Sequence, residues 1–490
     1  MSVLGIDVGT TNCKGVVLTS TGKMIAQATR RYKHDAESID DRCELPAEDF
    51  RDGVLSLIKT LAEQSNGVSP ITAVSLSTHG ETLIPIDANG NALSRAILSM
   101  DRRSVSDANE LEKRLGAKRF YEITGAPIHS MFPIAKLMWM KREQPELFSR
   151  ASGFVSTQDY LNGILGAKGF VDYSLASRFG GLDIRRRSWS DAIFDAAELS
   201  TQKLSLPVNA GTVIGEMPKA LRDALGMKEK VKIVAGGHDQ PCASLAMGAR
   251  DGRITVSAGS YESAAITTAS PLNDDNGFRG GMNSYCHVLK DRYVTLGFFA
   301  SGLIVQWFID KFCKYESACA KGDVHELLES MMPERPSGIC FIPHVFGSMN
   351  PEWNEQATAA FAGLRSTDGV GEMYKAVLEG LSCELDLNLR MLEKMANQCC
   401  DVVISGGGAA SDRWMRMRTE ICSRPISRLK DSADASCIGA AMLAAFGNGE
   451  PIQMNDIDSE TFMPENGAFY ASQKAHFLAL HGHSLAEVLK

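Results

Sequence analysis

The sequence lacks the features that mark membrane proteins, nucleic-acid-binding proteins and secreted proteins. No apolar run in its 490 residues approaches the ~18–20 residues that cross a bilayer. The formal net charge is −8 and no long basic run occurs, so we expect neither a membrane nor a nucleic acid as a partner. The first residues show no secretory signal pattern, which makes the cytoplasm the expected compartment.

The twelve cysteines form neither a disulfide framework nor a metal-binding pattern. There is no CxxC pair and no Cys/His array with zinc spacing. Several cysteines instead lie in apolar surroundings, where a reduced thiol packs as a small hydrophobic group; these are Cys242, Cys383, Cys422 and Cys437. A reducing compartment fits this usage.

Two common nucleotide fingerprints are also missing. The chain has no GxxxxGK[ST] motif, which excludes a P-loop kinase. A late glycine run, residues 406–408, follows an apolar strand at 401–405 but does not match the GxGxxG pattern of dinucleotide-binding proteins. Three glycines between a strand and a helix still let the backbone approach a flat ligand closely.

The composition is that of an ordinary globular α/β protein, with 44% hydrophobic and 22% charged residues. Its length suggests two or three domains. Residues 3–18 and 254–268 share one pattern, in which a strand, a turn of glycine and hydroxyl residues, and a second strand follow each other. This weak repeat predicts one domain at residues 1–247 and another at 248–490.

The first of these hairpins has the chemistry of a phosphate-binding turn. Gly9 permits a tight turn, and backbone N–H groups join the hydroxyls of Thr10 and Thr11 in one small space. Lys14 adds a positive charge, and Asp7 at the end of the strand could hold Mg²⁺ directly or through water. A plain hairpin in which Asp7 caps its own turn explains the same residues.

Polar clusters follow two further strands. His79 and Glu81 come after the apolar run 71–76, and Asp101 and Arg103 come after residues 96–98. Open α/β sheets bind ligands at such strand ends. Asp101 could accept hydrogen bonds from a polyhydroxy ligand while either Arg102 or Arg103 braces it. A surface hairpin tip and a solvated helix start are the competing interpretations.

A third strand, residues 231–235, runs through Gly236 and Gly237 into a helix expected from His238 to Met247. Asp239 then falls at or next to the N-cap of that helix. A carboxylate held there can face a cleft and act as a catalytic group, although aspartate is a favoured helix cap in any protein. Further helices are predicted at 48–64, 369–395 and, in an alanine-rich and tightly packed form, 435–446; residues from about 175 to 230 are expected to be helices and loops.

Four motifs together resemble the FGGY family of carbohydrate kinases. They are Asp7-x-Gly9-Thr10-Thr11, the 236–240 segment Gly-Gly-His-Asp-Gln, the 257–260 hairpin and the 406–409 glycine run. A narrower resemblance is to L-fuculokinase and related ketose (xylulose-type) kinases. The family resemblance implies two actin-like (ribonuclease H-like) domains with a cleft between them, the first binding a sugar or polyol and the second binding ATP with Mg²⁺.

The resemblance also implies roles for individual residues, with Asp239 as the catalytic base. The positions matched to the nucleotide and its metal are Asp7, Thr10, Thr11, Lys14, Ser260, Gly302, Gln306, Gly407, Gly408 and Asp412. The positions matched to the sugar are His79, Gly80, Glu81, Asp101 and Gln240, to which we add Arg103 as the brace of Asp101. A homodimer is left open.

The chain departs from the family pattern at several points. The second phosphate loop reads Gly259-Ser260-Tyr261, in which the hydroxyl is kept but the next residue is bulky. Ser99 stands where many members have Trp, and residues 346–351 replace a GERxP-like stretch. Gly80 replaces the Arg of glycerol kinase, which disfavours glycerol as substrate. An ATP-driven conformational machine or a non-catalytic nucleotide sensor remains the alternative to a kinase.

Overall fold

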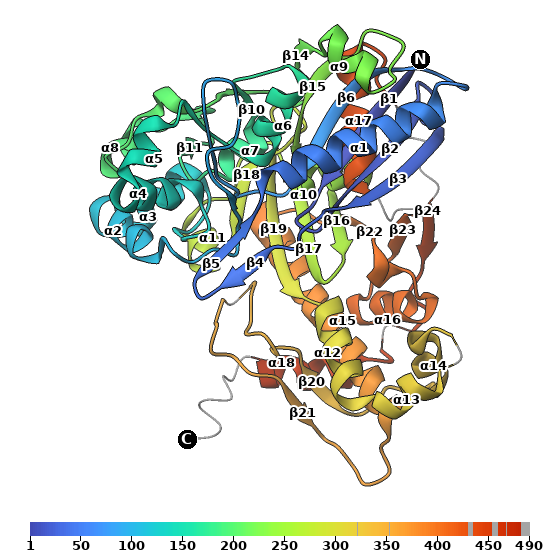
Figure 1. The fold of residues 1–490 in the computed structure, drawn as a ribbon. Helices are drawn as coiled ribbons and strands as arrows, with labels where there is room; N and C mark the ends of the chain where they lie inside the picture. The colour runs from blue at the N-terminus through green and yellow to red at the C-terminus, as the bar shows by residue number, and fades with distance from the viewer. Residues whose placement is uncertain (321, 352, 430–434, 453–458, 467, 482–490) are drawn as a thin grey trace.

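Two mixed β-sheets organise the chain in the computed structural model, which describes residues 1–490 except 321, 352, 430–434, 453–458, 467 and 482–490 (Figure 1). The first sheet has the order β14 (Val213–Glu216), β15 (Lys232–His238), β6 (Ile71–Thr78), β1 (Ser2–Val8), β2 (Asn12–Thr19) and β3 (Met24–Arg31). The second has the order β18 (Asn283–Cys286), β19 (Tyr293–Ala300), β17 (Tyr261–Thr268), β16 (Arg253–Ala258), β22 (Asp401–Ser405), β23 (Ile426–Leu429) and β24 (Ser459–Phe462).

The two sheets share one topology. In the first, β1, β2 and β3 form an antiparallel meander, and β6 and β15 are added in parallel on the other side of β1. In the second, β16, β17 and β19 form the meander, and β22 and β23 are added in parallel. The weak sequence repeat therefore reflects a duplicated arrangement, in which each glycine-containing hairpin occupies the same place in its sheet.

Alternating side chains of β1 and β2 bury both faces of the first sheet. Leu4, Ile6 and Val8 pack with helix α1 (Ala47–Ser65), whereas Val3 packs on the other face with α17 (Ala435–Asn448). Gly5 faces α17 and has no room for a side chain, because a Cβ there would lie 2.0 Å from the carbonyl oxygen of Cys437. The predicted tight packing of the alanine-rich helix is confirmed.

Helices α17 and α10 (Asp239–Ala246) lie between the two sheets. Helix α10 packs on the second sheet, where Ala243, Ala246 and Met247 contact Val403. The two helices touch backbone to backbone, since a Cβ on Gly439 would lie 1.9 Å from the carbonyl oxygen of Cys242. Helix α17 thus lies against the first sheet although it comes late in the chain, and the division at 247/248 remains a prediction.

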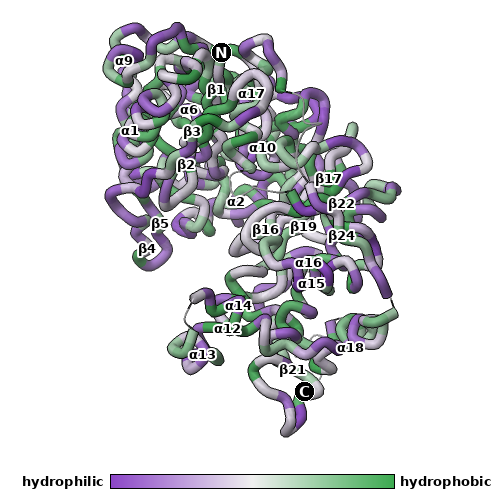
Figure 2. Tube along the Cα trace, turned by 90° about the vertical axis from the view of Figure 1, so that its right-hand side faces the viewer, coloured by the Kyte–Doolittle hydropathy of each residue, from purple (hydrophilic) through white to green (hydrophobic). Residues whose placement is uncertain are grey.

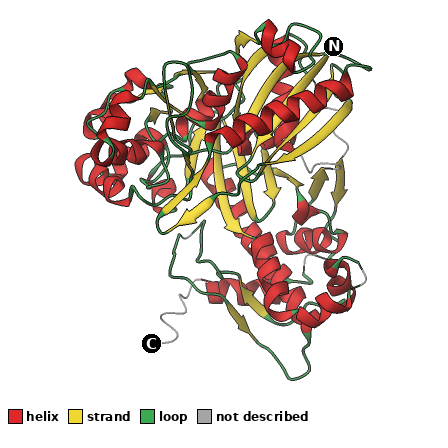
Figure 3. Ribbon diagram, in the orientation of Figure 1, coloured by secondary structure: helices red, strands yellow, loops and turns green. Residues whose placement is uncertain are grey.

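The second sheet is covered on its other face by the long helix α15 (Val370–Ala396), through Leu385, Leu389 and Leu392. Beyond α15 lie helices and a small hairpin, which Figures 1 and 3 show at the lower end of the molecule. They are α12 (Gly302–Phe312), α13 (Lys314–Cys319), α14 (Val324–Met331), α18 (Ala471–His481), β20 (Cys340–Ile342) and β21 (Ala360–Ala362). Helix α16 (Asp412–Cys422) packs beside α15 on the second sheet, through Met415 and Cys422.

A helical layer flanks the first sheet. Its helices are α2 (Val105–Leu115), α3 (Ala117–Thr124), α4 (Pro133–Glu143), α5 (Pro145–Arg150), α6 (Thr157–Leu165), α7 (Tyr173–Ser177), α8 (Asp191–Ala196) and α9 (Lys219–Ala224), and α11 (Asp275–Arg279) comes from the second half. A small three-stranded sheet contains β4 (Glu37–Ile39), β5 (Arg42–Leu45) and β8 (Ala96–Ile97). Three two-stranded sheets pair β7 (Ile84–Ile86) with β9 (Gly153–Val155), β10 (Phe170–Asp172) with β13 (Leu206–Val208), and β11 (Leu182–Asp183) with β12 (Ser188–Trp189). Figure 2 shows β4 as an outlying hydrophilic strand, in keeping with its exposure.

The predicted helices and strands around the candidate site are confirmed to within a few residues. The expectation of only helices and loops between about 175 and 230 is wrong, because β11–β14 lie there. These strands are two to four residues long, too short to show a clear alternation in sequence. Among the described residues, no helix is long and apolar enough to cross a membrane.

Candidate active site

Three parallel strands of the first sheet end side by side. In the register of β1, β6 and β15, Asp7 pairs with Ser77 and Ser77 with Gly237. The next residues along, Val8, Thr78 and His238, are again abreast. The sheet therefore brings Asp7, His79 and Asp239 to one edge, although they lie far apart in sequence. Carboxyl ends of parallel strands are the usual place for ligands.

Asp239 is the first residue of α10, and His238 is the N-cap residue, which makes no side-chain cap hydrogen bond. The Asp239 side chain keeps 31% of its surface exposed. Among the described residues, no donor hydrogen-bonds to its buried Oδ1; Nε2 of His238 lies 3.2 Å away without the geometry of a hydrogen bond. The capping interpretation of Asp239 thus has no support in these contacts.

The electrostatic surroundings of Asp239 oppose its ionisation. Burial, followed by the negative charges of Asp7 and Glu81, raises the pKa of Asp239 to about 8. A cation placed between Asp7 and Asp239 would relieve this repulsion and restore the carboxylate form. Carboxylate oxygens are the protein ligands that Mg²⁺ prefers, and the unpartnered Oδ1 leaves one of them available. The residues present therefore fit a magnesium ion.

The β1–β2 hairpin forms the turn that the sequence predicts. Gly9 N donates to the carbonyl of Asn12 at 3.0 Å, which leaves Thr10 and Thr11 exposed at the tip. Ser77 Oγ donates to Oδ1 of Asp7 at 2.9 Å, so Asp7 is oriented by the neighbouring strand. Lys14 is partly buried on β2, opposite Asp7 in the pairing of β1 and β2.

His79 is held by contacts on both ring nitrogens. Its Nδ1 lies 2.9 Å from the carbonyl oxygen of Val8, which can only accept, so Nδ1 carries the proton. Its Nε2 lies 3.2 Å from Oγ1 of Thr157, and the threonine hydroxyl is then the donor. Burial lowers the pKa of His79, so the ring is neutral. Gly80 beside it is tightly enclosed, since a Cβ there would lie 3.1 Å from the His238 ring.

Glu81 adopts a left-handed backbone conformation, with φ of 59°. Its carboxylate pairs with Nε of Arg178 at 2.5 Å. Burial by itself would raise the pKa of Glu81, but Arg178, His238 and Lys136 together outweigh it, so the pKa is lowered. The carbonyl oxygen of Glu81 accepts from Nζ of Lys136 at 2.7 Å. The predicted sugar-side residue is thus fixed by two buried cations that sequence patterns did not single out.

Asp101 and Arg103 form a buried ion pair. Nε and NH2 of Arg103 donate to Asp101 at 2.8 and 2.7 Å, and Cys43 N donates to it at 2.7 Å. NH2 of Arg103 also pairs with Glu44 at 2.5 Å, and its guanidinium lies over the ring of Trp139. Of the two neighbouring arginines, Arg103 is thus the one that braces Asp101, and the Asp101 side chain has no exposed surface in this conformation.

The network around the predicted sugar-side residues includes residues from the second half of the chain. Tyr285 of β18 places its hydroxyl 2.9 Å from Nδ1 of His238, and Asn283 Oδ1 accepts from Arg178 at 3.2 Å. Sequence reasoning missed Arg178, Lys136 and Tyr285, because each is a single residue with no motif around it. Gln240 lies on α10 next to Asp239 and is partly exposed.

The second glycine-containing hairpin packs on the start of α12. Leu303 N donates to the carbonyl of Ser260 at 2.9 Å, and Gly302 N donates to that of Gly259 at 3.1 Å. Gly302 must be glycine for this contact, because its Cβ would lie 2.6 Å from the Gly259 oxygen. Ser260 is exposed at the tip, and Tyr261 stacks on Phe298 with 5.0 Å between ring centroids.

The glycine run after β22 lies against the same hairpin. A Cβ on Gly406 would lie 2.5 Å from the carbonyl oxygen of Ala258, whereas Gly407 faces open space among the described residues. Asp412, the first residue of α16, pairs with Arg428 at 2.7 Å. Gln306 donates to Asp310 at 2.8 Å on α12. The structure thus brings Ser260, Gly302 and Gly407–Gly408 together, while Asp412 and Gln306 make side-chain contacts within the protein.

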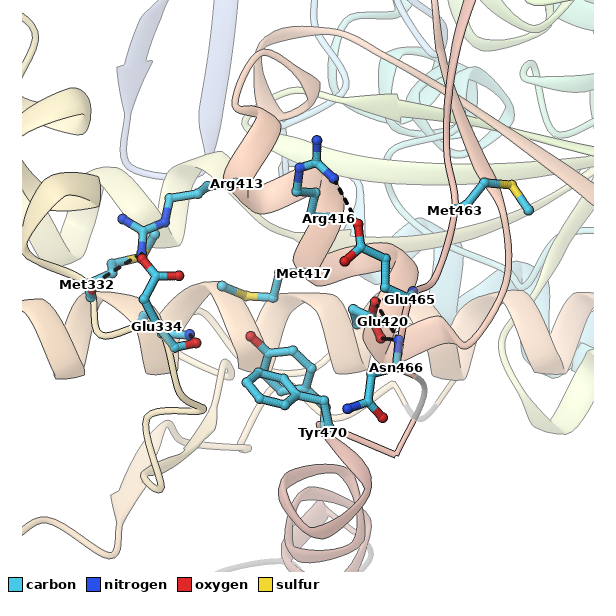
Figure 4. A pocket seen from close by; sticks show the side chains of 12 residues that line it. Met332, Glu334, Arg413, Arg416, Met417, Glu420, Met463, Glu465, Asn466 and Tyr470 are labelled. Atoms are coloured by element: carbon cyan, nitrogen blue, oxygen red, sulfur yellow. Dashed lines mark hydrogen bonds and ion pairs between the residues drawn. The ribbon is translucent and has the colours of Figure 1, made fainter.

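A separate pocket opens beside α16 (Figure 4). Its charged groups largely pair with one another or with the backbone: Arg413 with Glu334 at 2.9 Å, Arg416 with Glu465 at 3.5 Å, and Glu420 with the backbone N–H of Asn466 at 3.1 Å. Its lining residues are other than those predicted for the site. The candidate catalytic residues therefore lie where the strand ends converge and not in this pocket.

Two family models cover most of the chain. The N-terminal domain of the FGGY family of carbohydrate kinases matches residues 2–246, and its C-terminal domain matches residues 254–447. The chain belongs to the FGGY family of carbohydrate kinases. It is therefore a carbohydrate kinase that uses ATP with Mg²⁺, and the expected actin-like (ribonuclease H-like) α/β fold is confirmed.

Relatives extend over nearly the whole sequence. The chain is 26% identical to a gluconokinase of Bacillus licheniformis, covering 91% of this chain and 88% of the relative, and 26% identical to a xylulose kinase of Bacillus subtilis, covering 96% and 92%. In fold it resembles a ligand-bound xylulose kinase from Lactobacillus acidophilus, with a TM-score of 0.87, 23% identity and 98% coverage of both chains.

Proposed function

We propose that this carbohydrate kinase transfers the terminal phosphoryl group of ATP to a hydroxyl of a small sugar, a ketose or a polyol, with Asp239 as general base. The observation that carries the proposal is the Asp239 carboxylate, whose Oδ1 has no donor among the described residues and which is partly exposed at the strand ends beside Asp7. A base needs such a free oxygen to take the hydroxyl proton, a role worth roughly 10²–10⁴-fold in rate.

The two hairpins would hold the nucleotide. Exposed hydroxyls of Thr10, Thr11 and Ser260 and nearby backbone N–H groups can bind phosphate oxygens, with Lys14 as a cation. Asp7 would hold Mg²⁺, which supplies charge neutralisation for the transferring phosphoryl group. The nucleoside would lie along Gly407 and Gly408, of which Gly407 faces open space among the described residues, with Gly302, Gln306 and Asp412 at its edges. Positioning and charge neutralisation would account for most of the rate.

The sugar would lie between the strand ends and the 79–82 segment, near His79, Gly80, Glu81 and Gln240, with Asp101 and Arg103 behind. The charges favour a neutral substrate over an aldonate. Arg178 and Arg103 are each already paired with carboxylates, so neither guanidinium is left over to balance a carboxylate on the substrate. Among the sugars that the relatives' names mention, a xylulose-type ketose therefore suits the site better than gluconate.

A coupled ADP-release assay with MgATP tests the proposal. The panel contains D-xylulose, L-fuculose, polyols and gluconate. We expect turnover with one neutral sugar, and a loss of about 10²-fold or more in Asp239→Asn with nearly unchanged ATP binding. Steady ATP hydrolysis that no sugar stimulates would instead support the conformational ATPase, which family membership does not favour. Loss of ATP binding in Asp239→Asn would contradict the role of base.

The cytoplasm as location and the reduced state of the cysteines are part of the same proposal. Most thiols are buried, including those of Cys242, Cys383 and Cys422. A homodimer stays an open prediction, and sedimentation of the purified protein would decide it.

A further inference from the structure

Three potential metal ligands meet at the end of the molecule away from the strand ends described above. His344 follows β20, Glu384 lies in the middle of α15, and His481 is the last residue of α18. Helix α15 and β20 are in close contact, since a Cβ on Gly380 would lie 2.4 Å from the carbonyl oxygen of Phe341. Figures 1 and 2 both show α18 far from α10, so this cluster is separate from Asp239.

The ligand atoms converge on a single point. Nε2 of His344 lies 2.8 Å from Oε1 of Glu384, and Nε2 of His481 lies 3.2 Å from the same oxygen. The three atoms all lie within 4.8 Å of one another. Donor atoms around a tetrahedral Zn²⁺ lie roughly 3.3 Å apart, given bonds of about 2 Å. A small movement of the side chains would therefore admit the ion.

The carboxylate is left incompletely satisfied. Glu384 is 3% exposed, and both imidazoles approach Oε1, while Oε2 is buried and accepts no hydrogen bond within the described part of the chain. A buried charged oxygen without a partner is costly. Hydrogen bonds from the two imidazoles to Oε1 do not explain why Oε2 is buried without a partner. A divalent cation bound to the carboxylate would offset the negative charge of Glu384.

We propose that His344, Glu384 and His481 bind a zinc ion, with a water molecule in the fourth position. Two nitrogens and one carboxylate oxygen are a donor set typical of Zn²⁺, whereas Mg²⁺ and Ca²⁺ favour oxygen ligands alone. The site is distinct from the magnesium site of the kinase reaction. Because its ligands come from three elements, bound zinc would fasten α18 to α15 and to the segment after β20, and it would add to the stability of this end of the protein.

Metal titration of the full-length protein tests the site. The protein is stripped with a chelator, kept in excess Mg²⁺ so that oxygen-donor sites are occupied, and titrated with Zn²⁺ against a coloured competitor and with Co²⁺ for its visible spectrum. We expect one tightly bound ion per chain, with Co²⁺ bands typical of tetrahedral nitrogen and oxygen ligands. Zinc should also raise the temperature of unfolding.

Isosteric variants supply the decisive comparison. Glu384→Gln and His344→Gln should weaken zinc binding by about 100-fold or more and abolish the zinc-dependent rise in unfolding temperature. His325→Ala is the matched control, because His325 lies on α14, contacts Tyr374 of α15 and is outside the cluster. Unfolding of each variant without metal shows whether it has folded. Equal zinc affinity in the variants and the control, or no stoichiometric zinc in the wild type, would overturn the proposal and leave a hydrogen-bonded His–Glu–His cluster.

Discussion

Asp239 is held where its charge is unfavourable, beside Asp7 and Glu81 and with one oxygen unpartnered. Such an arrangement reduces the stability of the unliganded protein, but it leaves a carboxylate able to take a proton. The pKa of about 8 belongs to the protein without Mg²⁺; a bound cation would lower it into the range where the base is ionised at neutral pH.

Asp239→Asn should therefore stabilise the protein while it removes activity. The folded-state pKa of Asp239 lies above its ordinary value of 3.8, so its favourable contribution is complete below about pH 4 and is lost as pH rises through 8. We expect the variant to be more stable by about 1–2 kcal/mol at pH 8, after allowance for partial exposure, with a smaller difference at pH 5. Thermal unfolding at both pH values measures this.

The control for that experiment is Mg²⁺, which should raise the stability of the wild type more than that of Asp239→Asn. If Asp239→Asn is folded but less stable than the wild type at pH 8, the prediction is wrong. The Asp239 carboxylate would then have a stabilising partner in the folded protein.

Lys136 holds the backbone of the predicted sugar-side residues without being one of them. The side chain is fully buried, and Nζ donates to the carbonyl oxygens of Glu81 and Leu98 at 2.7 and 2.8 Å. It thereby ties the 79–82 segment to the strand end that leads to Asp101. Burial lowers the pKa of Lys136 to about 7.

Lys136→Met should destabilise the protein by about 2–4 kcal/mol, because two buried carbonyl groups lose their donor. It should raise the KM for the sugar about tenfold or more and leave the KM for ATP unchanged. Since the folded-state pKa of Lys136 is below its ordinary value, its contribution to stability is complete above about pH 10.5 and falls as pH drops through 7. The difference in stability from the variant should shrink over that range, and equal effects on both KM values would argue against a sugar-side role.

At the scale of elements, each predicted phosphate loop is a two-strand hairpin whose tip is placed by its neighbours. For the second hairpin the neighbour is α12, whose first turn donates backbone hydrogen bonds to Gly259 and Ser260. A helix can come this close only where it carries no side chain, and Gly302 meets that need. The element that holds the hairpin is thus as important as the hairpin itself.

Gly302→Ala should displace the hairpin tip, because the new Cβ would lie 2.6 Å from a backbone oxygen. We expect the KM for ATP to rise about tenfold or more while the KM for sugar changes little. Gly67→Ala is the matched control, since a Cβ there meets nothing within 4 Å among the described residues. A normal KM for ATP in the Gly302 variant would show that the tip does not contact the nucleotide.

At the scale of the whole molecule, α10 and α17 connect the two sheets. Helix α10 begins with Asp239 and continues onto the second sheet, while α17 returns from the second half to cover the first. The two helices meet closely at Gly439 and Cys242. Cys242 lies on α10 one turn after Asp239, so we expect a change at this contact to move Asp239.

Gly439→Ala should damage stability and catalysis together. Its Cβ would lie 1.9 Å from the Cys242 oxygen, so the helices must separate, at a cost of about 1–3 kcal/mol typical of overpacking. The turnover number should fall while the protein remains folded, which circular dichroism can check. Gly67→Ala again serves as control, and unchanged turnover with reduced stability would show that Asp239 tolerates movement of α10.

Sequence determined the local features of this protein. Apolar strands, glycine turns and the Gly-Gly-His-Asp segment depend on local backbone chemistry, so the two hairpins, the strand end before Asp239 and the family could be predicted from it. The register of β1, β6 and β15 was not visible in sequence, because hydrogen bonds between distant strands set it. Only the tertiary structure decided that Asp239 has an oxygen without a hydrogen-bond donor among the described residues. It also decided that Arg178 and Lys136 hold Glu81 and that α17 packs on the first sheet. Each of these depends on burial and on close contacts between segments far apart in the chain, which no local pattern encodes.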